Sequence, residues 1–211
     1  TLLVRCCAIS QFGLNRRASL VVIAAEWKTF LGTWTREIAA LETKNPNTKR
    51  PIDPVNGLGF PGATDAQIAV VESRLGVKLP PSYSEFLKAT NGLLQPFDYV
   101  ASYGGDFWPV EEIDWFRVRN AEWIEAYAVV DEALSDRGGI SFTDELRQTL
   151  EISHDGDSAV YLLNPRVVSA DGEWEAWVFA TWSPEVERFP SFAAMMQARY
   201  REFRERNGSG F

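Results

Sequence analysis

The segment ESRLGVKLPPSYSEFLKATNG, residues 72–92, constrains the fold of this chain more than any other, because it marks two helix ends within a short span. The first helix begins at a capping-box pattern, in which Thr64 accepts from the backbone N–H of Gln67 and Gln67 reaches back to Thr64. Gly76 stands at the C′ position, where a left-handed backbone costs glycine nothing. The pattern predicts a short helix between Thr64 and Gly76.

The second half of the segment predicts a rigid corner and a second helix. A residue before a proline is pushed out of the helical region, so Pro80 and Pro81 force an extended backbone after Leu79. Pro81 also suits the first turn of a helix, since its missing N–H is not needed there. Asn91-Gly92 ends this helix. Its apolar face is predicted to carry Tyr83, Phe86 and Leu87.

A longer amphipathic pattern precedes this motif. Apolar residues recur at steps of three and four from Leu20 to Leu41, which predicts a helix over 19–42 with one apolar face. Two arginines before the apolar run 18–25 resemble a weak secretory signal, but we favour the helix because the run is short. We expect a disordered or trimmed leader (1–18), this helix (19–42), a Pro- and Gly-rich linker (43–62) and the main domain (63–206).

The rest of the chain contains short helical and strand patterns. The pairs Asp155-Gly156 and Asp171-Gly172 predict type I′ hairpin turns. The second strand is almost continuously apolar at its end, so both of its faces are expected to be covered. The order of the predicted elements is helices, then strands, then a final helix. This order predicts a single domain with an α+β fold, in which a mainly antiparallel sheet packs against helices. The predicted strands are 158–163 and 173–182, and the predicted helices are 109–113, 121–134 and the stretch that Ser191 caps.

Charge and cysteine content narrow the classes of partner. The chain of 211 residues carries a formal net charge of −8. This charge disfavours nucleic acid and anionic membrane as partners, since both attract Lys and Arg, and favours a basic protein partner. No segment approaches the ~20 apolar residues of a membrane span. The two cysteines, Cys6 and Cys7, are adjacent and match no metal spacing, so we expect a reducing compartment, the cytoplasm.

The search for catalytic or metal-binding residues gives no specific motif. His154 is the sole histidine, and it lies beside a predicted turn with no nucleophile at a recognisable spacing. The stretch HDGDS runs into a strand, which favours a hairpin turn over a calcium loop. No glycine motif for phosphates or dinucleotides is present. We expect no enzyme activity, no metal and no cofactor; acid–base chemistry at Glu111, Asp114 or Asp157 is the least favoured alternative.

An acidic stretch rich in aromatic residues is the best candidate for a binding site. Adjacent aromatic residues cannot all face one core, and tryptophans beside carboxylates are typical of protein-binding surfaces. The alternative is that both tryptophans are buried and the carboxylates simply lie outside. The predicted partner-binding residues, two of them from the later turn, are Asp106, Trp108, Glu111, Glu112, Asp114, Trp115, Asp155 and Asp157.

The helix–corner–helix segment resembles the opening motif of the SMI1/KNR4 family, also called the SUKH superfamily. The residues that carry the resemblance are Ile68, Glu72, Leu75, Gly76, Leu79, Pro80, Tyr83, Phe86, Leu87, Asn91 and Gly92. Weaker similarities follow at Trp108-Pro109 with Glu111-Glu112-Ile113, at Gly156-Asp157 and at Pro190-Ser191-Phe192, so that about residues 60–203 are covered. Met195-Met196 departs from the aromatic–Leu pair expected in the last helix.

The resemblance implies a single SUKH-type α+β domain that binds proteins without catalysis. Bacterial members of the family are regarded as immunity proteins that neutralise cognate toxins, often nucleases, and fungal members as regulators of cell-wall synthesis and signalling. We therefore expect a monomer or weak dimer that covers the basic surface of a cognate toxin. The alternative is a regulatory scaffold that docks on its partner through the helix 19–42.

Overall fold

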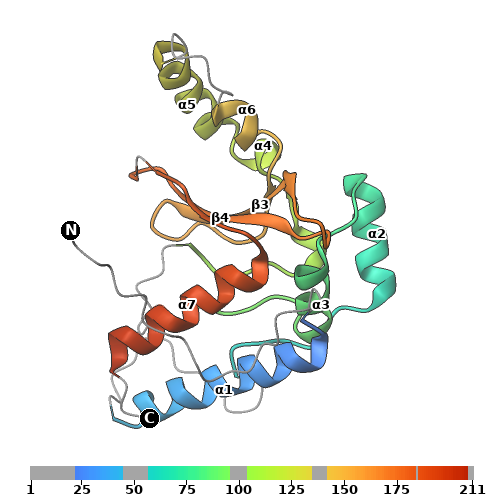
Figure 1. Ribbon diagram of the computed structural model, residues 1–211, viewed down its shortest axis with the longest axis vertical. Coiled ribbons are helices and arrows are strands. Elements are labelled where there is room, and N and C mark those ends of the chain that lie inside the picture. The colour runs from blue at the N-terminus through green and yellow to red at the C-terminus, as the bar shows by residue number, and fades with distance from the viewer. Residues whose placement is uncertain (1–21, 45–56, 96–103, 135–141, 184, 209–211) are drawn as a thin grey trace, which may run out of the picture.

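The computed structural model describes residues 22–44, 57–95, 104–134, 142–183 and 185–208 (Figure 1). The predicted leader, 1–18, lies outside these ranges. None of the described helices is long and apolar enough to cross a membrane. The helices are α1 (Ala24–Glu42), α2 (Asp65–Leu75), α3 (Pro81–Ala89), η1 (Val110–Glu112), α4 (Phe116–Arg119), α5 (Ala121–Leu134), α6 (Phe142–Leu146) and α7 (Phe192–Asn207). The strands are β1 (Asp114–Trp115), β2 (Leu150–Glu151), β3 (Ala159–Val168), β4 (Trp174–Ala180) and β5 (Glu187–Phe189).

One antiparallel sheet forms the centre of the fold. Its strands follow the chain order β1-β2-β3-β4-β5, and each pairs with the next in antiparallel orientation. Backbone bridges extend the sheet beyond the named strands, from Ser153 to Phe107 and from Phe107 to Leu93. The predicted α+β fold, with a mainly antiparallel sheet packed against helices, is confirmed.

Helices cover both faces of this sheet. Figure 1 shows α1, α3 and α7 on one face and α4, α5 and α6 on the other. Successive residues of β3 enter different clusters: Tyr161 packs with the first group of helices and Leu162 with the second. The same alternation holds in β4 for Trp177 and Val178. Successive side chains of a strand point to opposite faces of the sheet, and helices cover both faces here. The nearly continuous apolar sequence of β4 is explained by this arrangement, as predicted.

Helix α1 is part of the core. The centroid of the Trp27 ring lies 5.4 Å from that of Phe86 in α3 and 5.6 Å from that of Phe192 in α7. Trp27 Nε1 donates to the carbonyl oxygen of Ser82 at 3.0 Å. Because α3 and α7 cover the apolar face of α1, a partner of the alternative scaffold function could reach only the other face of this helix. Its buried residues are Trp27, Leu31, Trp34 and Ile38.

The helix–corner–helix motif is confirmed by the geometry of its ends. The Gln67 backbone N–H donates to Thr64 Oγ1 at 3.2 Å, and the Thr64 N–H donates to Gln67 Oε1 at 2.9 Å. Gly76 ends α2 with a φ of +73°. Pro81 is the first residue of α3. These contacts join residues at most a few positions apart, which is why the sequence alone indicates them.

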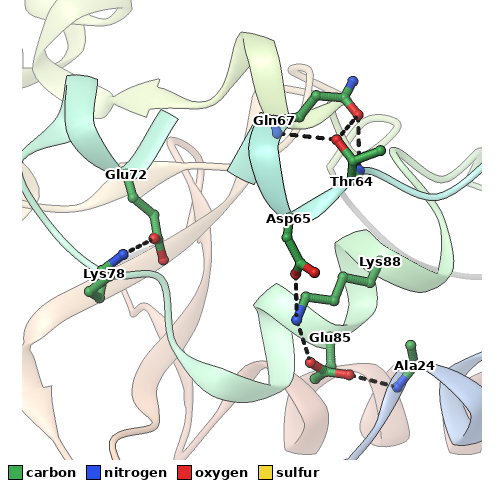
Figure 2. A network of polar contacts seen from close by, with 8 residues as sticks. All are labelled: Ala24, Thr64, Asp65, Gln67, Glu72, Lys78, Glu85 and Lys88. Carbon is green, nitrogen blue, oxygen red and sulfur yellow. Dashed lines mark hydrogen bonds and ion pairs between the residues drawn. The ribbon is translucent and has the colours of Figure 1, made fainter. Parts of the chain in front are cut away.

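Ion pairs and a hydrogen bond join three helices around this corner (Figure 2). Lys88 Nζ of α3 lies 3.0 Å from Asp65 Oδ1 of α2 and 2.9 Å from Glu85 Oε1. The other carboxylate oxygen of Glu85 accepts from the backbone N–H of Ala24, in the first turn of α1, at 3.0 Å. The same short segment thus orients α1, α2 and α3 relative to one another.

A distant residue caps the N-terminus of α3. Pro80 occupies the N-cap position, where no side-chain hydrogen bond forms. Glu173 supplies the acceptors instead: its Oε1 accepts from the Ser82 backbone N–H at 2.8 Å and its Oε2 from Ser82 Oγ at 2.6 Å. Because Glu173 directly precedes β4, this contact ties the sheet to the helical corner.

The end of the predicted linker belongs to the folded domain. Of the linker, 43–62, the structure describes 43–44 and 57–62. Leu58 is only 2% exposed and joins the larger core cluster. Gly59 forms a backbone bridge with Leu93. The packed domain therefore begins before residue 63, where the sequence analysis placed its start.

The first Asp-Gly turn is displaced from its predicted position. The two residues with positive φ are Asp157 and Ser158, both at +56°, and they form the two-residue loop before β3. Gly156, predicted as a loop residue, instead lies against the Gly104 backbone, where an added Cβ would come within 2.6 Å of the carbonyl carbon. The loop type is as expected, but it begins two residues later than the predicted Asp155-Gly156 pair.

The second Asp-Gly turn is longer than a type I′ turn. The Ser169 backbone N–H donates to the carbonyl oxygen of Glu173 at 2.9 Å, so three residues separate the paired positions. Within this loop Gly172 has a φ of +82°, while Asp171 does not have a positive φ. A three-residue loop with glycine in the left-handed region is the next most common hairpin connection.

Candidate protein-binding surface

The predicted acidic stretch forms a short turn that contacts α2 and the end of the helical motif. Pro109 precedes η1, and the Val110 N–H donates to Asn91 Oδ1 at 2.7 Å. Glu111 accepts from Gln67 Nε2 at 2.6 Å and from Asn91 Nδ2 at 3.2 Å. Burial acts to raise the pKa of Glu111, but hydrogen bonds from its own N–H, Asn91 and Gln67 outweigh it and lower the pKa. The turn therefore presents an ionised carboxylate in a fixed position.

Arg74 of α2 holds the other side of this turn. Its Nη1 lies 3.1 Å from Asp114 Oδ2, and its Nη2 donates to the carbonyl oxygen of Ile113 at 2.5 Å. The same Nη2 lies 3.4 Å from the carbonyl oxygen of Glu111. Because arginine carries several N–H groups in one plane, a single side chain spans η1 and β1. Asp114 also accepts from the Trp115 N–H at 2.8 Å, so its carboxylate is used within the fold.

Glu112 is exposed, whereas the tryptophan beside this turn is buried. The carbonyl oxygen of Glu112 accepts from Arg119 Nη2 at 2.5 Å. The Arg119 guanidinium in turn lies 4.2 Å from the centroid of the Trp108 ring. Trp108 is only 4% exposed, and its Nε1 has no hydrogen-bond partner among the described residues. The expectation that Trp108 serves as an exposed anchor is wrong, and the buried alternative holds for this residue.

Trp115 and Asp106 are half-buried. Trp115 packs against the larger core cluster, and the Arg117 guanidinium lies 4.9 Å from its ring centroid. Asp106 Oδ1 accepts from the Gln95 backbone N–H at 2.7 Å. Both side chains make contacts within the fold, so they add less to the exposed surface than the sequence analysis expected.

Asp155 and Asp157 come from a later part of the chain than the other predicted site residues. Both are exposed, and they lie in the loop that connects β2 to β3. That loop runs beside the backbone of Gly104 and Gly105, with the Gly104 N–H donating to the carbonyl oxygen of Gly156 at 2.9 Å. The start of the same loop pairs with the predicted acidic stretch, because the His154 backbone N–H donates to the carbonyl oxygen of Asp106 at 2.9 Å.

A buried carboxylate that the sequence analysis did not single out is Glu151. It is 3% exposed and accepts from Asn120 Nδ2 at 2.9 Å. Burial raises the pKa of Glu151 to about 7; the Asn120 hydrogen bond and the Arg119 charge oppose this shift, and the Asp155 charge adds to it. A glutamate in a two-residue strand gives no sequence signal of burial, because the cover comes from distant elements.

The remaining candidates for chemistry make structural contacts. His154 is exposed, and its ring meets Trp108 edge-to-face with centroids 5.5 Å apart. Within the described ranges, no group of three or more His, Cys, Asp and Glu side chains is placed to hold a metal ion. Glu111 and Asp114, weighed above as acid–base residues, are hydrogen-bonded to α2. Cys6 and Cys7 lie outside the described residues.

Trp182 is an exposed aromatic side chain that the predicted site does not include. It follows β4, is 51% exposed, and donates from Nε1 to the carbonyl oxygen of Asp157 at 2.7 Å. The sequence predicts a strand over 173–182 that ends with this residue, whereas β4 ends at Ala180. The Ser183-Pro184 pair that follows is a turn signal, and it could have indicated this earlier strand end.

The fold and the surface together define a single-sheet α+β domain with an acidic turn held by a helix–corner–helix motif. The chain belongs to the SMI1/KNR4 family (SUKH-1), whose family model matches residues 62–198. Members of this family are generally non-catalytic immunity or regulatory domains. A search among curated proteins found no match.

The matched region is more acidic than the chain as a whole. Residues 62–198 contain 23 Asp and Glu against nine Lys and Arg, a formal net charge of −14. The rest of the chain contains six Asp and Glu against 12 Lys and Arg, a formal net charge of +6. The negative charge is therefore concentrated in the family domain, which also contains both acidic groups described above.

Proposed function

We propose that this protein is a non-catalytic binding domain of the immunity type, which neutralises a cognate toxin by covering the basic surface of that toxin. A toxin that acts on nucleic acid needs Lys and Arg side chains to bind phosphates, and an acidic protein seated on them excludes the substrate. The proposal includes a cytoplasmic location, in keeping with the adjacent Cys6 and Cys7 and the reducing compartment they favour.

The observation that carries this proposal is the net charge of −14 on residues 62–198, together with the held carboxylate turn at η1. Charge of this kind can accelerate association with an oppositely charged partner by roughly 10 to 10³-fold at low salt. Because Gln67, Asn91 and Arg74 fix the turn, Glu111 and Glu112 are presented without ordering on binding, which lowers the entropic cost of the complex.

The test uses purified toxins that are encoded beside the gene, measured by biolayer interferometry at several salt concentrations. We expect binding with an association rate that falls steeply between about 50 mM and about 500 mM NaCl. Glu112→Lys should slow association several-fold, because a rim charge acts mainly on the encounter step. The matched control is Glu205→Lys, an exposed glutamate of α7 outside the family region. Absence of binding to every such toxin would count against the proposal.

A further inference from the structure

Three arginines of the acidic family region meet at the turn between α6 and β2. In the sheet, β2 lies between β1 and β3. Arg117, which follows β1, reaches the turn from one side, and its Nη1 donates to the carbonyl oxygen of Arg147 at 2.8 Å. Arg166 of β3 reaches it from the other side, and its Nη1 donates to Gln148 Oε1 at 3.0 Å. The two acceptors belong to consecutive residues, so Arg117, Arg147 and Arg166 form one arginine cluster.

Two further contacts limit the freedom of this cluster. The Arg117 guanidinium lies 4.9 Å from the centroid of the Trp115 ring, which itself packs against the larger core cluster. Gln148, the acceptor for Arg166, donates from its Nε2 to the carbonyl oxygen of Asp144 at 3.0 Å. The arginine side chains are therefore partly ordered before any ligand arrives, which lowers the entropic cost of binding.

The positive charge of the cluster is only partly neutralised within the fold. Arg147 forms an ion pair with Asp144, with 3.1 Å between Nη1 and Oδ1. Arg117 and Arg166 are exposed, and their hydrogen bonds go to neutral oxygens. Within the described part of the chain, neither of them has a carboxylate at ion-pair distance. A guanidinium carries five N–H donors, so both arginines retain donors for a ligand.

The chemistry of the cluster and the charge around it define the class of ligand. A planar fork of N–H donors matches the paired oxygens of a carboxylate or a phosphate. The net charge of −14 on residues 62–198 repels a ligand more strongly as the negative charge of that ligand rises. A phosphate dianion, a nucleic acid or an anionic membrane is therefore disfavoured relative to separate carboxylate groups.

We propose that the arginine cluster is a binding site for carboxylate side chains on an acidic segment of a protein partner. Arg117 and Arg166 each donate N–H groups to a carboxylate of that segment, from the two sides of the turn. The site differs from the acidic turn at η1 in its residues and is opposite in charge. The inference therefore goes beyond the proposed function and does not depend on it.

The experiment follows the full-length protein by ¹H–¹⁵N NMR while a peptide of alternating Asp and Gly is added. The side-chain amide of Gln148 reports on the cluster, because its oxygen accepts from Arg166. We expect this signal and the backbone amides of Arg117 and Arg166 to shift most. A matched peptide of alternating Asn and Gly should not shift them, because its side chains carry no charge. Inorganic phosphate should bind more weakly than the Asp peptide.

Two substitutions remove the charges one at a time. Arg117→Gln and Arg166→Gln each keep a side-chain N–H donor, and each should weaken binding of the Asp peptide by about threefold or more, because a charge-assisted hydrogen bond is lost. Both arginines are exposed, so the amide spectrum of each variant should otherwise match that of the wild type. The matched control is Arg201→Gln, which removes the same charge from an exposed position on α7 and should leave the affinity unchanged.

Three results would overturn the inference. One is an absence of shifts at the cluster at millimolar Asp peptide, and another is an unchanged affinity in both Arg117→Gln and Arg166→Gln. The third is inorganic phosphate that binds as tightly as the Asp peptide, since the ligand would then not be a carboxylate. None of these results bears on the toxin proposal, which Glu112→Lys tests on another element.

Discussion

Glu151 shows how the position of one residue in a sheet can outweigh its chemical type. The two residues of β2, Leu150 and Glu151, are 0% and 3% exposed. Successive residues of a strand face opposite sides of the sheet, and here helices cover both sides. The carboxyl group is therefore largely shielded from solvent, and Asn120 Nδ2 donates a hydrogen bond to it.

Replacing Glu151 by Gln keeps an acceptor for Asn120 and removes the charge. The pKa of Glu151 is about 7 in the folded state, against an ordinary value of 4.5. Between these values the folded state binds more protons than the unfolded state, so stability falls as the pH rises. Glu151→Gln should abolish this fall and be more stable above pH 7 by on the order of 2 kcal/mol. Urea unfolding between about pH 5 and about pH 8 measures the effect.

The control for this pH dependence is Glu112→Gln, since Glu112 is exposed. This variant should keep the pH slope of the wild type. A Glu151→Gln protein with the wild-type slope would show that another group causes it.

Helix α3 shows how one element depends on another that is distant in sequence. Its N-cap is a proline, which has no side chain able to accept a hydrogen bond. Glu173 fills that role from across the fold, and it is only 9% exposed. Because the contact joins residues 91 positions apart, it forms only once the hairpin is docked on the corner.

A graded pair of substitutions at Glu173 tests this cap. Glu173→Ala leaves two buried donors of Ser82 without acceptors and should destabilise the protein by about 2–3 kcal/mol. Glu173→Gln retains one carbonyl acceptor for the Ser82 N–H, so its loss should be about half as large. Thermal and urea unfolding give both values. Equal losses in the two variants would mean that packing, rather than capping, explains the contribution of Glu173.

The element ends that the sequence predicts correctly depend on neighbours a few positions away. The capping box of Thr64 and Gln67, the left-handed Gly76 and the cap at Ser191 are of this kind. The first hairpin loop was predicted two residues early, because the approach of the Gly104 backbone to Gly156 decides its position. No local pattern contains that contact.

The candidate surface was predictable in part for the same reason. The acidic residues at 111, 112 and 114 are visible in the sequence, and Glu111 and Glu112 are exposed. The burial of Trp108 depends on Arg119 and His154, which come from two other segments. The exposure of Trp182 depends on the end of β4 two residues earlier than expected. Side-chain exposure is thus set by tertiary contacts that residue type does not reveal.

At the scale of the whole molecule, the folded unit is larger than the family match. The match begins at residue 62, whereas α1 lies well before it and packs on α3 and α7. The helix carries four buried side chains, two of them tryptophans. Its removal would expose the aromatic cluster that it covers, so α1 is a structural part of the domain in this chain.

Trp27→Ala tests whether α1 is integral to the domain. Trp27 is 2% exposed and packs on Phe86 and Phe192, so its truncation should cost about 3–5 kcal/mol in the free energy of unfolding. The control is Lys28→Ala, at the adjacent exposed position, which should change stability by no more than about 0.5 kcal/mol. A loss below about 1 kcal/mol for Trp27→Ala would show that the family region folds without this helix.

The attachment of η1 to α2 through Gln67 and Arg74 has a consequence for how a complex would form. A surface held in this way is expected to change little in shape on binding, so the two proteins would associate as rigid bodies. The shape and charge of the unbound domain would then determine which partner it binds. A change of partner would require substitutions of surface residues only, and the buried core could stay the same.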